Sequence, residues 1–155
     1  MPIRLLNRFL DENHIRYTCY NHKPTFTAQE TAHVLHVSGH DLVKTVLLIV
    51  DDRMVMAVLP ACERIDFDLF KAQAGAKHVA LAKEQDLEDL APLCDRGSLP
   101  PIGNLYGMEV FVASTVVADE VICFSGGTHT EDIQMSYDDW EHLVQPRIMS
   151  FTYMH

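Results

Sequence analysis

Hydrophobic residues recur along this chain with two different periods, one helical and one strand-like. Ile3, Leu6, Phe9 and Leu10 follow the helical period and predict an amphipathic helix over residues 3–13. Comparable patterns, with capping residues at the start and Gly or Pro at the end, predict further helices over residues 28–36, from 66 or 67 to 75, 83–91 and 137–144.

The strand-like pattern is strongest over residues 42–50, which form a nearly continuous apolar run. Asp51 and Asp52 are suited to a tight turn, and residues 54–59 then supply the second strand of a hairpin that Pro60 ends. Further strands are predicted over residues 17–20, 78–81, 109–113, 120–124 and 131–135, whereas residues 147–155 show no readable pattern.

This mixture predicts an α+β fold in which helices surround a mixed, curved, partly closed sheet or barrel. A length of 155 residues suits one core, and no repeat or linker divides the chain, so residues 1–155 are expected to form a single domain. The proportions of 48% hydrophobic and 22% charged residues are those of an ordinary globular protein.

The sequence carries no targeting pattern. No long apolar run follows the charges at the N-terminus, and the longest apolar stretch, residues 46–50, is too short to span a bilayer. The four cysteines lie far apart without a C-x-x-C pair. Together these features predict a cytoplasmic protein with reduced thiols and no membrane partner.

The formal net charge of −10 argues against a broad nucleic-acid-binding surface, because phosphate affinity depends on clustered Lys and Arg. A site that grips a single nucleotide end needs few such contacts. The charge therefore argues against broad nucleic-acid binding but is compatible with a site that binds a single nucleotide end.

Lys44 interrupts the most apolar strand of the sequence. Both faces of that strand are otherwise apolar, which predicts an inner strand of the sheet. An ammonium there either enters a pocket or extends to water at the strand end, because an unpaired buried charge is costly. Position alone leaves both interpretations open.

Two glycine-containing segments are candidates for substrate contact. Residues 96–104 hold two glycines and adjacent prolines, a rigid turn whose backbone N–H groups can hold an oxyanion or simply join a helix to a strand. Residues 125–130 form a second turn, where Gly126 and Gly127 permit close approach of a ligand. His129 in this turn either lines a pocket or is exposed, and its spacing favours exposure.

Other chemistries have weaker support. His33, His36 and His40 would share one helical face, but Gly39 interrupts it, and neither H-E-x-x-H nor C-x-x-C is present, so no metal site is predicted. The acidic pairs at 51–52 and 138–139 are typical of a turn and a helix start. Nucleophile-elbow, P-loop and dinucleotide-binding motifs are absent.

The order of these segments resembles the YbaK/aminoacyl-tRNA-synthetase-associated domain family, which includes prolyl-tRNA editing domains. The likeness spans about residues 5–145 and is carried by five blocks, none specific alone. They are residues 22–30, the V-K-T strand at 43–45, Val58-Leu59-Pro60 with Ile65-Asp66, residues 97–103, and Gly-Gly-Thr-His at 126–129.

The resemblance implies a hydrolase that deacylates mischarged tRNA, typically tRNA for proline carrying Ala, Ser, Cys or Thr, without a metal or other cofactor. It implies that Lys44 is the key active-site residue and that backbone amides of the loop at Gly97, Ser98 and Gly103 hold the substrate carbonyl. The positions expected to bind substrate are Thr27, Thr45, Pro100, Pro101, Ile102, Gly126, Gly127, Thr128 and His129.

Some family members carry Asn directly after the lysine, a feature linked with alanine editing, whereas this chain has Thr45. The expected partner is the acceptor end of an aminoacyl-tRNA, delivered by prolyl-tRNA synthetase or an elongation factor. Lys44 is expected to act either as a cationic anchor or, if desolvated, as a base. Two further readings are a non-catalytic module that binds an amino acid, nucleotide or protein, and a metallohydrolase using the histidines.

Overall fold

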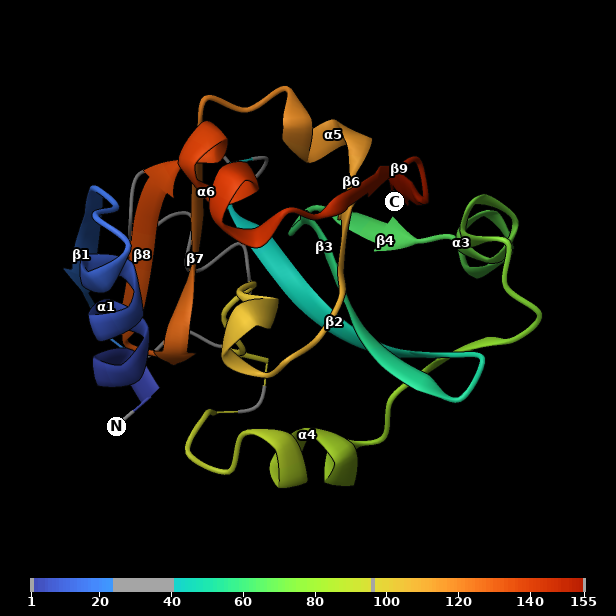
Figure 1. Cartoon of the computed structure of the whole chain (residues 1–155), viewed down its shortest axis with the longest axis horizontal. Helices are drawn as coiled ribbons and strands as arrows, with labels where there is room; N and C mark the ends of the chain where they lie inside the picture. The colour runs from blue at the N-terminus through green and yellow to red at the C-terminus, as the bar shows by residue number, and fades with distance from the viewer. Residues whose placement is uncertain (1, 24–40, 96, 155) are drawn as a thin grey trace.

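The computed structural model describes residues 2–23, 41–95 and 97–154 (Figure 1). The helix expected over residues 28–36, its capping residue Thr27, and His33, His36 and His40 lie outside these ranges. None of the helices in the described ranges is long and apolar enough to cross a bilayer.

A five-stranded sheet carries the hairpin predicted from the sequence. Its strand order is β5-β2-β3-β6-β9, with β2 and β3 antiparallel and β6 parallel to both β3 and β9. The inner position of β2, between β5 and β3, confirms the prediction made from its two apolar faces. The strands are β2 (Val43–Val50), β3 (Arg53–Pro60), β5 (Val79–Leu81), β6 (Val110–Ala113) and β9 (Arg147–Met149).

A second sheet of three antiparallel strands has the order β1-β8-β7, formed by β1 (Tyr17–Asn21), β8 (Glu131–Ser136) and β7 (Val121–Thr128). Helix α1 (Pro2–Glu12) lies against this sheet (Figure 1) and buries Leu6 and Leu10 completely. A parallel bridge between Leu42 and Cys123 joins the edge of β7 to the segment leading into β2. The two sheets therefore form the mixed, curved arrangement that the sequence predicts.

The hairpin turn places both aspartates in the left-handed region, with φ of 47° at Asp51 and 68° at Asp52. Val50 pairs directly with Arg53, so the loop has two residues, the geometry that follows the twist of the flanking strands. The Asp51 carboxylate also accepts the backbone N–H groups of Lys77 and His78. The prediction that residues 51–52 form a turn is confirmed.

The helix caps are those expected from the sequence. Asp66 accepts the N–H of Leu69 at the start of α3 (Phe67–Ala74), and Gly75 ends it with φ of 66°. Ser136 accepts the N–H of Asp139 at the start of α6 (Tyr137–Val144). The helix predicted over residues 83–91 is also present, as α4 (Glu84–Leu90).

Several short elements were not predicted. They are β4 (Glu63–Ile65), β10 (Thr152–Met154), β9, helix α5 (Ser114–Val117) and the 3₁₀ turn η1 (Gly103–Leu105). Strand β7 also continues four residues past the predicted end at 124, through a bulge between Ser125 and Thr128. Each short strand depends on a distant partner, since β10 pairs with β4 and β9 with β6, which local periodicity cannot reveal.

The C-terminal segment is fixed by aromatic packing in the main core. The Phe70 ring meets those of Phe111 and Phe151 edge-on, with ring centroids 5.1 and 5.0 Å apart. Phe151 is fully buried, as is Trp140, whose indole N–H donates to the Pro101 carbonyl at 3.0 Å. Trp140 thereby connects α6 to the glycine- and proline-containing loop.

Candidate functional site

Lys44 is the second residue of β2 and its side chain is partly buried. Burial, followed by the nearby Arg64 charge, lowers the pKa of Lys44, while Cys62 and Glu63 oppose that change. The ammonium thus lies near residues 62–64, at the transition from β3 to β4, and is partly withdrawn from water. This partial burial leaves both roles considered for Lys44, cationic anchor and base, chemically open.

Thr45, the next residue along β2, points to the opposite face of the strand. It lines a cavity of about 190 Å³ that also includes Gly97 and Leu99 from the glycine- and proline-containing loop. Its hydroxyl oxygen is buried and has no hydrogen-bond partner in the described part of the chain. A buried hydroxyl without a partner is unusual in a folded protein, and it marks this position of β2.

The loop after α4 is held rigidly from Ser98 to Gly103. Ser98, Leu99 and Ile102 are buried, and Ser98 donates its backbone N–H to the Asp95 carbonyl at 3.1 Å. That amide is therefore engaged within the loop, whereas exposed Gly97, with φ of 79°, borders the cavity beside Thr45. Pro100 and Pro101 are also buried.

Packing leaves no room for a side chain at position 103. A Cβ atom at this position would lie 2.2 Å from the Met108 carbonyl oxygen and 2.6 Å from a methyl group of Val110. The Gly103 carbonyl in turn accepts the N–H groups of Tyr106 and Met108. The glycine thus closes the end of the loop against β6.

The second glycine segment folds onto this loop. Ser98 Oγ and His129 Nδ1 lie 3.3 Å apart, and His129 is partly buried rather than fully exposed. Gly126 and Gly127 are buried, with Gly127 at φ of 107°. Thr128 contacts the hydroxyl of Thr130 and the carboxylate of Glu131, which closes the turn.

Asp95, which sequence reasoning did not single out, joins the two segments. Its backbone N–H donates to the Gly127 carbonyl at 2.8 Å, and its carboxylate accepts the N–H of His129 at 3.0 Å. The only sequence signal was an acidic residue immediately before the glycine-containing loop. Its role depends on a partner more than thirty positions away.

His22 and Asp132 form a second connection that sequence reasoning missed. Their side chains are 4% and 2% exposed, and His22 Nε2 is hydrogen-bonded to Asp132 Oδ2. His22 Nδ1 lies 2.7 Å from the Lys23 carbonyl, which can only accept, so Nδ1 carries a hydrogen. One proton is consequently shared between Nε2 and Oδ2, and the pair as a whole is neutral.

This pair lies close to the second glycine segment. The His22 backbone N–H donates to the Thr130 carbonyl at 2.9 Å. Burial raises the pKa of Asp132, against the lowering effects of His22, Ser125 and His129. The polar residues Asp95, His22 and Asp132 therefore hold the turn that brings His129 to Ser98.

The structure thus gathers the predicted residues into two groups. Thr45 and Gly97 share one cavity, and Ser98 contacts His129. Within the described ranges no hydrogen bond joins Lys44 to either glycine segment, so the convergence of Lys44 with the loop stays a prediction. Thr27 lies outside the described residues.

Cys19, Cys94 and Cys123 do not have the acidity of a catalytic nucleophile. Burial, with Asp132 and Asp41, raises the pKa of Cys123 to about 12. Burial also raises the pKa of Cys19 and Cys94. A catalytic cysteine needs the opposite change, because the thiolate is the reactive form.

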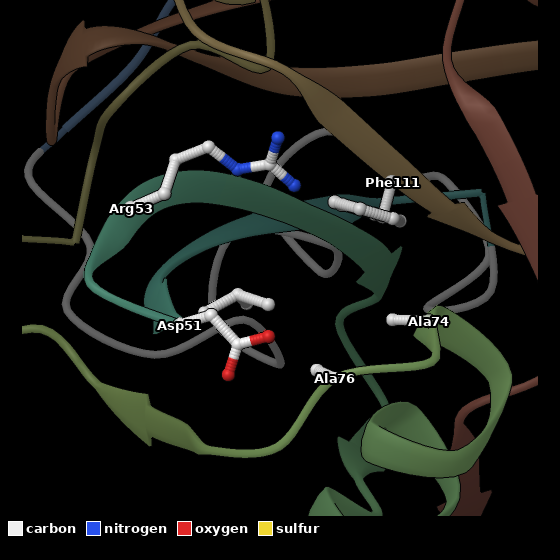
Figure 2. Close-up of a pocket in the computed structure, with 6 residues that line it drawn as sticks. Asp51, Arg53, Ala74, Ala76 and Phe111 are labelled. Atoms are coloured by element: carbon white, nitrogen blue, oxygen red, sulfur yellow. The ribbon is translucent and has the colours of Figure 1, made fainter.

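A separate hollow of about 320 Å³ lies at the other end of the hairpin (Figure 2). It is bordered by Asp51 of the turn, by Arg53 at the start of β3, by Phe111 of β6, and by Ala74 and Ala76 around the end of α3. Asp51 is engaged with backbone N–H groups and Arg53 pairs with Glu109 at 3.0 Å. None of the predicted site residues borders this hollow.

Within residues 2–23, 41–95 and 97–154, no three His, Cys, Asp or Glu side chains gather as metal ligands would. The histidines at 33, 36 and 40 lie outside those ranges.

The family model of the aminoacyl-tRNA editing domain matches residues 22–143. No curated protein matches the chain. The structure of a hypothetical protein, APE2540, superposes with a TM-score of 0.86 at 19% identity, covering 96% of this chain and 99% of its own. A candidate trans-editing enzyme for prolyl tRNA synthetase gives 0.85 at 15% identity, covering 98% and 97%. At these identities the likeness shows a common fold.

Proposed function

Because the chain belongs to the aminoacyl-tRNA editing domain family, we propose that it hydrolyses the ester of mischarged aminoacyl-tRNA. The observation that carries this proposal is the family match over residues 22–143, which includes Lys44 and both glycine segments. The expected substrate is tRNA for proline bearing Ala, Ser, Cys or Thr. We expect the protein to act in the cytoplasm, with prolyl-tRNA synthetase or an elongation factor as the source of substrate.

The chemistry requires stabilisation of negative charge on the ester carbonyl oxygen. We assign the donor role to the amides of Gly97 and Gly103, because the Ser98 N–H is engaged with Asp95. Loss of one such preorganised donor typically costs about 3 kcal/mol of transition-state stabilisation.

Lys44 would bind the terminal phosphate or ribose and orient the ester, remaining cationic throughout. The attacking water would be activated by the neighbouring ribose hydroxyl. In the alternative, Lys44 loses its proton and serves as the base, a role that its lowered pKa favours. The two roles predict opposite dependence of the deacylation rate on pH.

The direct test is deacylation of a panel of tRNA-Pro species charged with Ala, Ser, Cys, Thr or Pro. Wild-type protein should hydrolyse at least one mischarged species and spare Pro. Lys44→Ala should lose about 10²-fold or more in kcat/KM, the scale of a positioned acid–base or ionic group. Lys71→Ala, which removes an exposed lysine on α3, is the matched control and should retain activity.

Absence of turnover with every charged tRNA would contradict the proposal. Saturable binding of a free amino acid or nucleotide in that case, lost in Lys44→Ala, would instead identify a non-catalytic module. Circular dichroism and thermal unfolding of Lys44→Ala must match those of the wild type for either comparison to stand.

A further inference from the structure

The side-chain hydroxyl of Ser98 is a buried group to which the proposed mechanism gives no task. Ser98 is only 1% exposed, although serine is a residue that usually lies at the surface. Its backbone N–H is already engaged with the Asp95 carbonyl, at 3.1 Å. The hydroxyl needs a hydrogen-bond partner of its own, because burying a polar group without one is costly.

That partner is the ring of His129, in the turn between β7 and β8. Ser98 Oγ and His129 Nδ1 lie 3.3 Å apart, although the two residues are 31 positions apart in the sequence. A hydroxyl can donate to Nδ1 or accept from it, and either direction fixes this edge of the ring. The contact joins the glycine- and proline-containing loop to the second glycine segment through two side chains.

The backbone of His129 is held by the same loop. Its N–H donates to the Asp95 carboxylate at 3.0 Å, and the Asp95 N–H donates to the Gly127 carbonyl at 2.8 Å. Since Asp95 also accepts the N–H of Ser98, the contacts among Asp95, Ser98 and His129 close a ring. His129 is thus anchored at its backbone and at its imidazole, which restricts both side-chain torsions to one rotamer.

The imidazole is accessible despite these anchors. His129 is partly exposed, whereas Ser98 and Gly127 are buried. Because Ser98 occupies the Nδ1 edge, a ligand would meet the opposite edge of the ring. A side chain that is fixed before the ligand arrives costs less to order on binding, and it does not move aside for a group of the wrong shape.

We propose that Ser98 is a positioning residue, whose hydroxyl holds the His129 ring as a fixed wall of the pocket for the aminoacyl group. The wall admits a small mischarged group and excludes the cyclic prolyl group. This inference rests on the proposed function, and it gives the side chain of Ser98 a task separate from that of the backbone amides in its loop.

The test compares kcat/KM for the mischarged tRNA that the wild type hydrolyses best with kcat/KM for tRNA-Pro carrying Pro. Ser98→Ala should lower the ratio of the two by about fivefold, the value of one hydrogen bond. Ser98→Thr keeps the hydroxyl and should recover most of the ratio. Ser114→Ala is the matched control, because it removes the hydroxyl of an exposed serine that is paired with Ser150, and it should leave the ratio unchanged.

A double-mutant cycle separates positioning from an independent contact of Ser98 with substrate. His129→Phe keeps a planar ring but has no nitrogen for the Ser98 hydroxyl. In that background Ser98→Ala should change the ratio by less than about twofold, because the contact is already lost. An equal effect of Ser98→Ala in both backgrounds would overturn the inference.

NMR of the imidazole nitrogens keeps the test independent of turnover. Ser98→Ala should shift the ¹⁵N resonance of His129 Nδ1 more than that of Nε2, whereas Ser114→Ala should shift neither. Ser98→Cys fills the buried position with a weak hydrogen-bonding group and should give the same result if the alanine variant is unstable.

An unchanged Nδ1 resonance in a folded Ser98→Ala or Ser98→Cys variant would overturn the inference. A loss of stability without any change of the kcat/KM ratio would show a structural serine and would overturn it as well. Failure of the wild type on every charged tRNA would instead contradict the proposed function, and the NMR spectra would still decide whether Ser98 fixes the ring.

Discussion

His22 and Asp132 share one proton in the interior, at the point where the end of β1 meets β8, with both side chains almost fully buried. Nδ1 of His22 already donates to the Lys23 carbonyl, so Nε2 must face a group that can share or donate a hydrogen. An asparagine at 132 meets this requirement, because its NH₂ group donates to a neutral Nε2. An alanine does not.

Variants at position 132 should differ in stability according to this requirement. Asp132→Asn should fold with nearly wild-type stability, whereas Asp132→Ala should lose about 1–3 kcal/mol of unfolding free energy, since it leaves a buried imidazole nitrogen unpaired. Urea unfolding at neutral pH measures both. Equal losses in the two variants would contradict the shared-proton arrangement.

The same pair gives a pH dependence. Burial raises the pKa of Asp132 above its ordinary value of 3.8, so the folded state holds this proton more tightly than the unfolded chain. Its contribution to stability is fully present below that ordinary value and is lost as the pH rises through the raised one. The stability of Asp132→Asn relative to wild type should therefore increase as the pH rises from the ordinary value through the raised pKa of Asp132. A decrease with rising pH would reverse the sign and contradict the assignment.

Local patterns were sufficient to predict the framework around these residues. The apolar run at 42–50 and the two aspartates after it specified an inner strand and a two-residue turn, and both are present. Asp66, Gly75 and Ser136 marked helix ends correctly because a cap involves residues only a few positions apart.

Contacts between distant residues could not be predicted in this way. Asp95, His22 and Asp132 owe their roles to partners on other elements, which no local pattern reveals. The tail at 147–155 has the same character, since β10 exists only through its pairing with β4. The resemblance to the editing family identified Lys44 and the glycine segments, but it gave no indication of the carboxylates that surround them.

Asp95 should influence activity more than stability. Asp95→Ala removes the oxygen that accepts the His129 N–H, and it should reduce kcat/KM for deacylation by about fivefold, the value of one hydrogen bond near 1 kcal/mol. Asp95→Asn keeps an acceptor oxygen and should recover most of that loss. An Asn variant as impaired as the Ala variant would show that the charge, not the hydrogen bond, is what matters.

Gly103 offers a prediction about packing. Gly103→Ala places a methyl group 2.2 Å from the Met108 carbonyl oxygen, so it should lower the free energy of unfolding by about 2–3 kcal/mol. Gly107→Ala is the matched control, because Gly107 has φ of 62° but open space around it and should lose only about 1 kcal/mol. Gly103 itself has no positive φ, so a loss no larger than that of Gly107→Ala would mean that Met108 and Val110 move aside at little cost, and it would contradict the packing requirement.

The role of Lys44 is decided by the pH–rate profile of deacylation. If Lys44 is the base, activity rises with pH through its lowered pKa, and Lys44→Arg removes both this limb and most of the activity, because a guanidinium does not lose its proton. If Lys44 is an anchor, activity falls as the ammonium is neutralised, and Lys44→Arg keeps activity to higher pH. The two roles therefore predict opposite changes of activity as the pH rises through the pKa of Lys44, and one pH–rate profile distinguishes them.

The net negative charge of the chain predicts a weak dependence of deacylation on salt concentration. With 22 acidic residues against 12 Lys and Arg, the surface as a whole repels the tRNA backbone, so productive contact must be confined to the acceptor end. Each phosphate neutralised on a single strand contributes about −0.7 to the slope of log affinity against log salt. Contact through one or two cations therefore predicts a slope for kcat/KM no steeper than about −1.5, measured by deacylation at increasing KCl. A slope near −5 would require a broad basic surface and would contradict contact confined to the acceptor end.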